Sequence, residues 1–430
     1  MSQTAPRWLP GAGGEPDGFR ARPGRDDIAH LSTGFDDDMA PDRAFPLPYG
    51  LAASAELLRR AGGELASLPV AVRIAGLSRV ARSWLDPDDA LRREAMETLP
   101  DELGFSPEMV AWALDAAFSE VTSESLQAWW ARDGGAAAAG LSGHIWSGNV
   151  FVAGVPPVLG SLLGGVPALI KAPSAHPTFA ALFARSVALH APELGPCVGA
   201  AAWDRGDERT TRLLLEADVA YVFGDDATIA AVRELAPAGC VVAGFGHRIS
   251  VGVVSGSVGV SDEELDGLLL DCLAYDGGGC LTPRWVFCAG GMSAAEVLAR
   301  RAAERAPGVA SSLPGLPLDD EAAAARSQYV GIVGFGGYAQ AGAGWCVAAQ
   351  DGLEPVPPGR TLCFVAVDAL EAVPPLLAPL GDVIQGVVFA GGDLSDGLPV
   401  AGSLTRRAGG LQRPPLDWDH DGVQILEVLR

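Results

Sequence analysis

The chain has almost no lysine. Lys171 is the only one, and the other 29 of its 30 basic residues are arginine. A codon bias toward Arg, Ala, Gly and Pro accounts for most of this shortage. Such a bias makes the single exception informative, because Lys and Arg are not equivalent at a crowded ligand site. Lys171 is therefore a candidate functional residue.

Cations are scarce overall, and the patterns of membrane and secreted proteins are missing. The chain has 30 Lys+Arg against 53 Asp+Glu, a formal net charge of −23 and a pI near 4.5. Nucleic acid is therefore excluded as the main partner, because its phosphates must be met by clustered cations. The chain contains no uninterrupted run of about 18 apolar residues, the length that is needed to span a membrane. The first residues also lack the basic start and apolar block of a signal peptide.

The seven cysteines include no CxxC pair. Their odd number and scattered positions in a long chain fit reduced thiols better than a disulfide framework. The six histidines lack metal-ligand spacing, and we interpret the acidic cluster at 417–421 as a solvated tail or a subunit contact rather than a metal site. We expect a cytoplasmic globular protein without a metal centre.

Apolar sequence is abundant and is arranged in alternating strands and helices. Of the 430 residues 49% are hydrophobic, and at about 150 residues per domain the length predicts two or three domains. Short apolar runs predict strands at 168–170, 197–203 and 219–223, and helical patterns predict helices at 176–190 and 227–235. This alternation implies a parallel sheet, whose ligands bind at the carboxyl ends of the strands.

A second α/β unit is expected from about Ile249. Ser261–Glu264 has the pattern of a capping box at the start of a helix with an apolar stripe. A glycine loop, Gly277–Gly279, follows this helix, and a strand is predicted through 285–287.

Cys280 stands directly after the three glycines, which let the backbone approach a ligand closely and leave the thiol unhindered. Cys272 falls on the apolar stripe of the preceding helix and Cys288 falls in a strand, so both are predicted to be core residues. Cys280 is therefore the candidate nucleophile, although its position alone fits a structural role equally well.

Two further residues have side chains suited to thiol chemistry. His247, within Gly244–Arg248, could take the proton of a reactive thiol or protonate a leaving group. A turn histidine that bonds nearby backbone is the alternative. Asn149, in a loop expected at His144–Asn149, could donate a hydrogen bond to a developing oxyanion or could simply form a turn.

Two glycine motifs suggest phosphate binding. Gly224 and Asp225 join a predicted strand to a predicted helix, where backbone N–H groups could face a pyrophosphate, but the same residues suit a plain helix N-cap. Gly334–Ala339 imitates the dinucleotide fingerprint GxGxxA. Because no helical periodicity follows it, we interpret this match as accidental.

Together these segments resemble the aldehyde dehydrogenase superfamily, and in particular its acyl-CoA reductase branch, whose namesake is the fatty-acid reductase of bacterial luminescence. The resemblance covers roughly Leu141 to Gly422. It rests on segments that follow one another in the order of the family, at 144–149, 168–174 (ALIKAPS), 218–234, 244–250, 275–283 (YDGGGCLTP) and 412–422 (QRPPLDWDHDG).

The resemblance implies an α/β fold of two Rossmann-like domains with parallel sheets. The expected parts are an irregular segment at 1–45, an NAD(P)-binding domain at 46–245, a catalytic domain at 246–401, and a tail at 402–430 that packs back or bridges subunits. Members of the superfamily are usually dimers or tetramers, so a homo-oligomer is expected.

The resemblance also implies a reaction, the reduction of an acyl thioester of CoA or of a carrier protein to an aldehyde by NADPH, with NADH as the other possible cofactor. Its residues fall into a catalytic group and a cofactor group, namely Cys280 (nucleophile), Asn149 (oxyanion donor) and His247 (acid and base) in the first, and Lys171, Ser174, Gly224 and Asp225 in the second.

The chain departs from ordinary aldehyde dehydrogenases in two places. No acid occupies Gly246–His247, where those enzymes carry the glutamate that activates the hydrolytic water, and this counts against oxidation to a free acid. The phosphate loop has Gly224–Asp225 where the family often has Gly-Ser. Two alternatives stay open: a CoA-acylating or other aldehyde dehydrogenase that runs oxidatively, and a non-catalytic scaffold that retains the fold.

Overall fold

The computed structural model describes residues 51–357, 359–392 and 404–430. The irregular segment expected at 1–45 lies outside these residues. The described chain forms two compact units, which are taken here one at a time. The first unit contains residues 51–246 and 415–430, and the second contains residues 247–357, 359–392 and 404–414.

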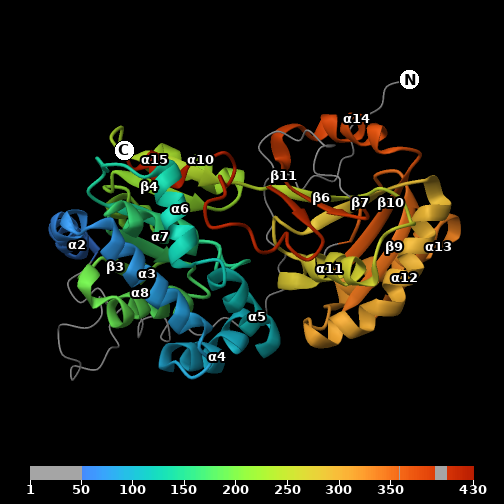
Figure 1. Cartoon of the computed structure of the whole chain (residues 1–430), viewed down its shortest axis with the longest axis horizontal. Coiled ribbons are helices and arrows are strands. Elements are labelled where there is room, and N and C mark those ends of the chain that lie inside the picture. The colour runs from blue at the N-terminus through green and yellow to red at the C-terminus, as the bar shows by residue number, and fades with distance from the viewer. Residues whose placement is uncertain (1–50, 358, 393–403) are drawn as a thin grey trace. The chain divides into compact units, whose positions relative to one another are not determined.

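The first unit is built on a five-stranded parallel sheet in the order β3-β2-β1-β4-β5 (Figure 1). Its strands are β1 (Ser142–Ile145), β2 (Ala168–Ala172), β3 (Val198–Ala202), β4 (Val219–Phe223) and β5 (Val241–Phe245). Its helices are α2 (Leu51–Ser67), α3 (Val70–Leu85), α4 (Ala90–Leu103), α5 (Pro107–Phe118), α6 (Ser123–Asp133), α7 (Val155–Gly164), α8 (Thr178–His190), η1 (Pro192–Leu194), α9 (Glu208–Leu214), α10 (Asp226–Leu235) and α15 (Ile425–Val428). The strands and helices predicted between 168 and 235 are confirmed.

Apolar side chains from both the strands and the helices fill the first unit. Leu58 of α2, Leu214 of α9 and Ile229 of α10 share one core with Leu169 of β2 and Val222 of β4. A second core is aromatic, with Trp84 of α3 against Phe118 of α5 and Phe179 of α8 at ring-centroid distances of 5.5 and 5.4 Å. Burial of the strands by helices in this way is typical of parallel sheets.

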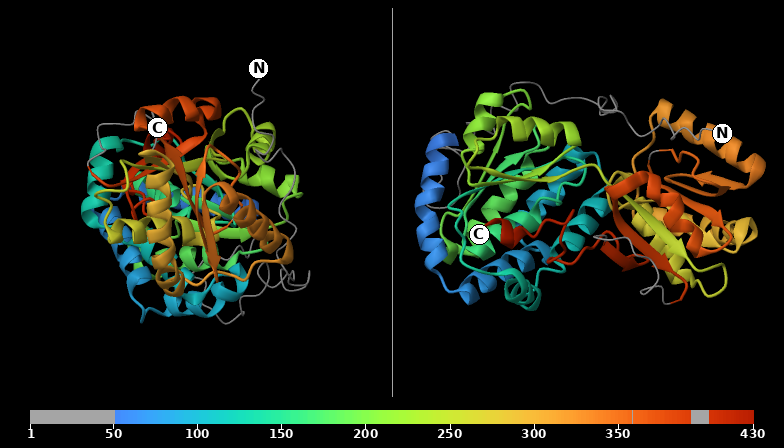
Figure 2. Two further views of the ribbon diagram at one scale, coloured as in Figure 1. Left: turned by 90° about the vertical axis from the view of Figure 1, so that its right-hand side faces the viewer. Right: turned by 90° about the horizontal axis from the view of Figure 1, so that it is seen from above.

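The second unit is built on a seven-stranded sheet in the order β12-β11-β6-β7-β10-β9-β8, in which only β8 is antiparallel to its neighbour. Its strands are β6 (Ile249–Val254), β7 (Pro283–Ala289), β8 (Tyr338–Gly342), β9 (Trp345–Asp351), β10 (Thr361–Val367), β11 (Ile384–Ala390) and β12 (Leu404–Arg407). Its helices are α11 (Asp262–Leu273), η2 (Ala274–Gly277), α12 (Gly291–Ser312), α13 (Asp320–Gly336), η3 (Leu370–Ala372), α14 (Val373–Leu377) and η4 (Ala378–Val383). Figure 2 shows this sheet from two further directions.

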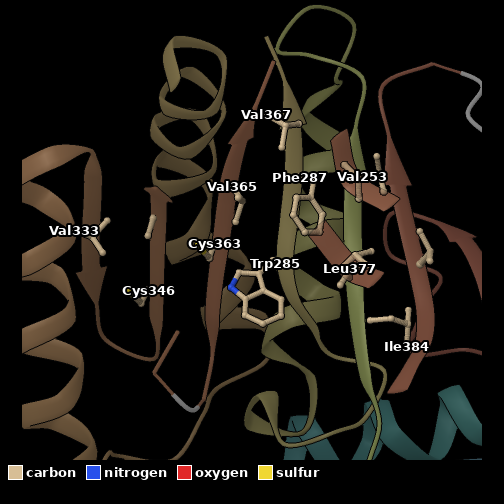
Figure 3. Close-up of a cluster of buried hydrophobic side chains, with 14 of the residues drawn as sticks. Val253, Trp285, Phe287, Val333, Cys346, Cys363, Val365, Val367, Leu377 and Ile384 are labelled. Atoms are coloured by element: carbon tan, nitrogen blue, oxygen red, sulfur yellow. The ribbon is translucent and has the colours of Figure 1, made fainter. Parts of the chain in front are cut away.

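Figure 3 shows the buried cluster on this sheet, in which Trp285 and Phe287 of β7 lie beside Val365 of β10. Val333 of α13 and Leu377 of α14 belong to the same cluster. Helices α11 and α12 also contact the sheet, through β7 and β10. The core fixes the strands of the second unit, and with them the loops at the strand ends.

The helix start predicted at Ser261–Glu264 is confirmed, and a second local signal marks the start of α5. The Ser106 side chain accepts a hydrogen bond from the backbone N–H of Met109, with Pro107 at the first helical position. Ser261 and Glu264 form the reciprocal capping box of α11. No helix among residues 51–357, 359–392 and 404–430 is long and apolar enough to cross a membrane.

Candidate active site

The loops that follow the strands of the first sheet carry the predicted cofactor residues. Because β1 to β5 are parallel, their carboxyl ends meet at one edge of the sheet. Lys171 lies near the end of β2 and Ser174 follows it, Gly224 and Asp225 follow β4, and Asn149 follows β1. The structure therefore places these five predicted residues at the same edge of one unit.

Lys171 lies beside the indole ring of Trp203 at this edge. Its Nζ is 5.9 Å from the centroid of the Trp203 ring, and the Ser174 hydroxyl donates a 2.7 Å hydrogen bond to the Trp203 carbonyl oxygen. Burial lowers the pKa of Lys171 most, and the positive charge of Arg205 lowers it further. The negative charge of Asp204 raises it. No sequence motif indicated that Trp203 and Arg205 would lie beside Lys171.

Asp225 is the N-cap of α10. Its carboxylate accepts a 2.6 Å hydrogen bond from the backbone N–H of Thr228. The plain N-cap interpretation of Gly224–Asp225 therefore describes the local structure, and it puts a negative charge at a helix start where a phosphate would otherwise be favoured.

Asn149 is exposed in the loop after β1. The Ser147 hydroxyl donates a 2.9 Å hydrogen bond to its Oδ1. This bond holds the amide oxygen, and the NH2 group is the donor end of the amide.

The loop expected at His144–Asn149 is shorter than predicted, because His144 and Ile145 belong to β1. The His144 ring is buried, lies 2.9 Å from the Ser142 hydroxyl and stacks on Tyr221 with centroids 5.0 Å apart. Burial lowers the pKa of His144 to about 3, so the ring is neutral near pH 7. His144 is a packing residue.

Cys280 and His247 lie at one edge of the second sheet. Strands β6 and β7 are parallel and adjacent, with Ser250 opposite Pro283. His247 and Cys280 each stand three residues before this pair, at the amino ends of the two strands. The Ser250 hydroxyl donates a 2.9 Å hydrogen bond to the Cys280 carbonyl oxygen and ties the two segments together.

Burial separates Cys280 from most of the other cysteines. Cys272 and Cys288 are fully buried, which confirms their prediction as core residues. The remaining buried thiols are those of Cys197, Cys346 and Cys363, whereas Cys240 and Cys280 are half-buried. Burial, with a smaller contribution from Asp218, raises the pKa of Cys240 to about 11.

The turn before Cys280 has an unexpected backbone. Tyr275 and Asp276 adopt left-handed φ values of 51° and 53°, and Gly277 follows at 73°. Among the three loop glycines, Gly277 alone has a positive φ. The glycine pattern therefore located the turn, but not the two residues with side chains that precede it.

The C-terminal segment packs on the first unit. Arg132 of α6 pairs with Asp417 and Asp419 at 3.4 and 2.7 Å, so the acidic cluster is not simply a solvated tail. The His420 ring lies 4.6 Å from the Phe245 ring and 4.6 Å from the Trp418 ring. Within the described residues no group of three or more His, Cys, Asp or Glu side chains could hold a metal ion.

Gly334–Ala339 connects the end of α13 to β8. A dinucleotide fingerprint needs a strand that leads into a helix, which is the opposite order. The structure therefore supports the interpretation of this motif as an accidental match.

Solved structures with the same fold are aldehyde dehydrogenases. An NAD-dependent benzaldehyde dehydrogenase from Corynebacterium glutamicum is 16% identical with a TM-score of 0.60, over 83% of this chain and 85% of that one. An NADP-dependent glyceraldehyde-3-phosphate dehydrogenase from Bacillus halodurans, complexed with NADP, is 13% identical with a TM-score of 0.61, over 83% and 82%. An aldehyde dehydrogenase from Bartonella henselae is 13% identical with a TM-score of 0.59, over 84% and 82%. The chain therefore has the aldehyde dehydrogenase fold.

The family follows from a second comparison. The model of the acyl-CoA reductase (LuxC) family matches residues 65–429, and the chain belongs to this family. It is an oxidoreductase, as the resemblance predicted. A comparison with curated protein sequences finds no match.

Proposed function

We propose that this enzyme reduces an acyl thioester to an aldehyde with NADPH, through an acyl-enzyme on Cys280. One observation carries the proposal. Cys280 is half-buried and stands, like His247, three residues before the paired residues Ser250 and Pro283 at the amino ends of two adjacent strands, whereas five of the other six cysteines are buried.

The residues of the first unit fit a nicotinamide dinucleotide at its adenosine end. Lys171 and Ser174 lie against Trp203, and the positive charge of Arg205 lies close enough to lower the pKa of Lys171. Two cations favour the extra phosphate of NADPH over the bare hydroxyl of NADH. Gly224 and α10 would face the pyrophosphate, although Asp225 opposes its charge. When bound, the reduced nucleotide supplies the hydride that the reaction needs.

The protein's own residues make and break the thioester. The Cys280 thiolate attacks the acyl carbon, the bond from that carbon to the carrier sulfur breaks, and the acyl group becomes attached to Sγ. The backbone N–H of Cys280 stabilises the oxyanion, and the resemblance to aldehyde dehydrogenases assigns Asn149 the same role, worth about 2.7–4 kcal/mol per donor. His247 takes the thiol proton and returns it to the leaving thiolate. After reduction the C–S bond to Cys280 breaks, which releases the aldehyde and leaves the thiolate, and one proton from solvent then restores the thiol and His247 to their starting state.

The substrate is an acyl ester of CoA or of a carrier protein. The absence of an acid at Gly246–His247 supports reduction, because no carboxylate there would activate water to hydrolyse the acyl-enzyme. All seven cysteines are free thiols, which supports a reducing, cytoplasmic setting.

The test is oxidation of NADPH and of NADH by the purified protein over a series of acyl-CoA chain lengths, with the aldehyde measured directly. The Cys280→Ala variant is expected to lose turnover at least 1,000-fold, on the order of the loss on removal of other catalytic nucleophiles. Cys240→Ala is the matched control, since it removes the other half-buried thiol, and it is expected to retain turnover. Full activity in Cys280→Ala would refute the acyl-enzyme, and formation of acyl-CoA from aldehyde, CoA and NADP+ without any reduction of acyl-CoA would establish the oxidative alternative.

A further inference from the structure

The backbone that leads to Cys280 is held in a conformation that its residues do not favour. Tyr275 and Asp276 lie between the end of α11 and the glycine loop, with φ and ψ of 51° and 33° and of 53° and 28°. A side chain makes the left-handed region unfavourable, and two such residues in succession are rare. Contacts from outside the turn must therefore maintain it.

Arg360 supplies these contacts from the segment before β10. Its Nη1 lies 3.1 Å from Asp276 Oδ1, and its backbone N–H donates a 3.3 Å hydrogen bond to the Asp276 carbonyl oxygen. The same Nη1 donates to the carbonyl oxygen of Leu273, at the end of α11, at 3.1 Å. Arg360 thus bonds to the chain on both sides of Tyr275.

The guanidinium is itself fixed by two more segments. Its Nη2 donates a 2.6 Å hydrogen bond to the Leu313 carbonyl oxygen after α12, and its Nε donates to the Gly344 carbonyl oxygen between β8 and β9. The Arg360 side chain is only 3% exposed. The planar guanidinium donates to four acceptors at once, and this arrangement fixes its position. The ammonium of a lysine cannot make the same set of bonds.

Two glycines allow the close approach. A Cβ on Gly277 would lie 2.8 Å from the Arg360 backbone nitrogen, and a Cβ on Gly315 would lie 2.7 Å from Asp276 Oδ1. These separations are shorter than side chains permit. At Gly277 the turn is therefore packed against the backbone of Gly359 and Arg360, and at Gly315 the backbone is packed against the side chains of the ion pair.

We propose that the Asp276–Arg360 ion pair is a positioning element that sets the place of the Cys280 thiol. Cys280 stands four residues after Asp276, and the Ser250 hydroxyl holds its carbonyl oxygen from the other side. The segment that carries the nucleophile is thus held at two points, by the ion pair at Asp276 and by the hydrogen bond from Ser250. This inference rests on the proposed role of Cys280.

The test uses the full-length protein with Arg360→Lys and Asp276→Asn. Asparagine is the side chain other than glycine best tolerated in the left-handed region, so Asp276→Asn adds no backbone strain of its own while it removes the charge that pairs with Arg360. Three quantities are measured: kcat and KM for acyl-CoA, the rate at which iodoacetamide alkylates Cys280 in the native protein, and the melting temperature. We expect kcat to fall about 10- to 100-fold, as for a misplacement of about 1 Å, with KM changed less than about threefold. The Cys280 alkylation rate is expected to change in parallel with kcat.

Arg73→Lys is the matched control, because Arg73 is a buried arginine of the first unit that donates to the carbonyl oxygens of Leu65, Ala66 and Leu68. It is expected to lower the melting temperature and to leave kcat and Cys280 alkylation unchanged. Unchanged kcat and alkylation in a folded Asp276→Asn or Arg360→Lys protein would overturn the proposal, as would an equal loss of kcat in Arg73→Lys. If Cys280→Ala itself retains turnover, the proposed acyl-enzyme fails, and the Cys280 alkylation rate still decides whether the ion pair positions this thiol.

Discussion

At the scale of single residues, local pattern predicted the burial of side chains better than it predicted their partners. Cys272 and Cys288 lie at apolar positions of a helix and a strand, and both are buried as predicted. The partners of Asp276 are contributed by segments more than 35 residues away in the sequence, such as Leu316 and Arg360. No local pattern carries that information, so the left-handed turn and its ion pair were not predictable.

Asp271 is a second residue whose role depends on distant partners. It lies in α11 and is completely buried, and its carboxylate accepts hydrogen bonds from the backbone N–H groups of Gly409, Leu411 and Gln412 at 2.8, 3.1 and 3.4 Å. Burial raises the pKa of Asp271 to about 7, because desolvation of the charge outweighs these three bonds. The group therefore connects α11, which precedes the Cys280 turn, to the segment after β12.

This raised pKa predicts a pH dependence of stability. The folded protein keeps the Asp271 proton up to about pH 7, whereas the unfolded chain releases it near pH 4, so the contribution to stability is complete below pH 4 and is lost as pH rises through 7. Between pH 5 and pH 8 the wild type should lose about 3 kcal/mol relative to Asp271→Asn, which cannot titrate. Urea unfolding of both proteins at the two pH values measures this difference. Parallel pH dependence of the two proteins would contradict the assignment.

At the scale of elements, the sequence predicted helices and strands well where local pattern defines them. It did not predict a strand that depends on pairing with a distant segment. Strand β4 is observed at the residues predicted, and α10 begins one residue before its predicted start. These elements are set by hydrophobic period and by capping side chains, which are local. Strand β12 was not predicted, because Leu404–Arg407 is short and polar and acquires its structure by pairing with β11.

The start of α10 offers a test of the cofactor site. Asp225 caps the helix and at the same time opposes a phosphate there, so its two effects can be separated by substitution. Asp225→Ser keeps a capping oxygen and removes the charge, and we expect it to bind NADPH several-fold more tightly at unchanged stability. Asp225→Ala removes both and should cost about 1 kcal/mol of stability. Calorimetric titration with NADPH and urea unfolding check the two expectations, and weaker NADPH binding by Asp225→Ser would show that this carboxylate contacts the cofactor favourably.

At the scale of the whole molecule, the described chain runs from the first unit into the second and then returns to the first. Residues 415–430 belong to the first unit, where the Tyr221 hydroxyl donates a 2.7 Å hydrogen bond to the carbonyl oxygen of Ile425. The backbone N–H groups of Ala138 and Ala139 donate to the carbonyl oxygen of Leu429 at 2.9 and 3.1 Å. The last 16 residues are therefore part of the core that supports the proposed cofactor site, a contact that alternation of strands and helices does not predict.

Tyr221→Phe tests whether this C-terminal packing serves the first unit alone. The substitution leaves the buried Ile425 carbonyl oxygen without its donor, which should cost about 1–3 kcal/mol. A ligand of the same unit acts in the opposite direction, and NADPH at 100 times its Kd should restore about 2.7 kcal/mol. Hydrogen exchange followed by mass spectrometry should show faster exchange in peptides from β1, β2 and β4, reversed by NADPH, with peptides from β7 and β10 unaffected. Equal acceleration in both sheets would mean that the two units unfold together, and the C-terminal segment would then stabilise the whole chain rather than the unit it packs on.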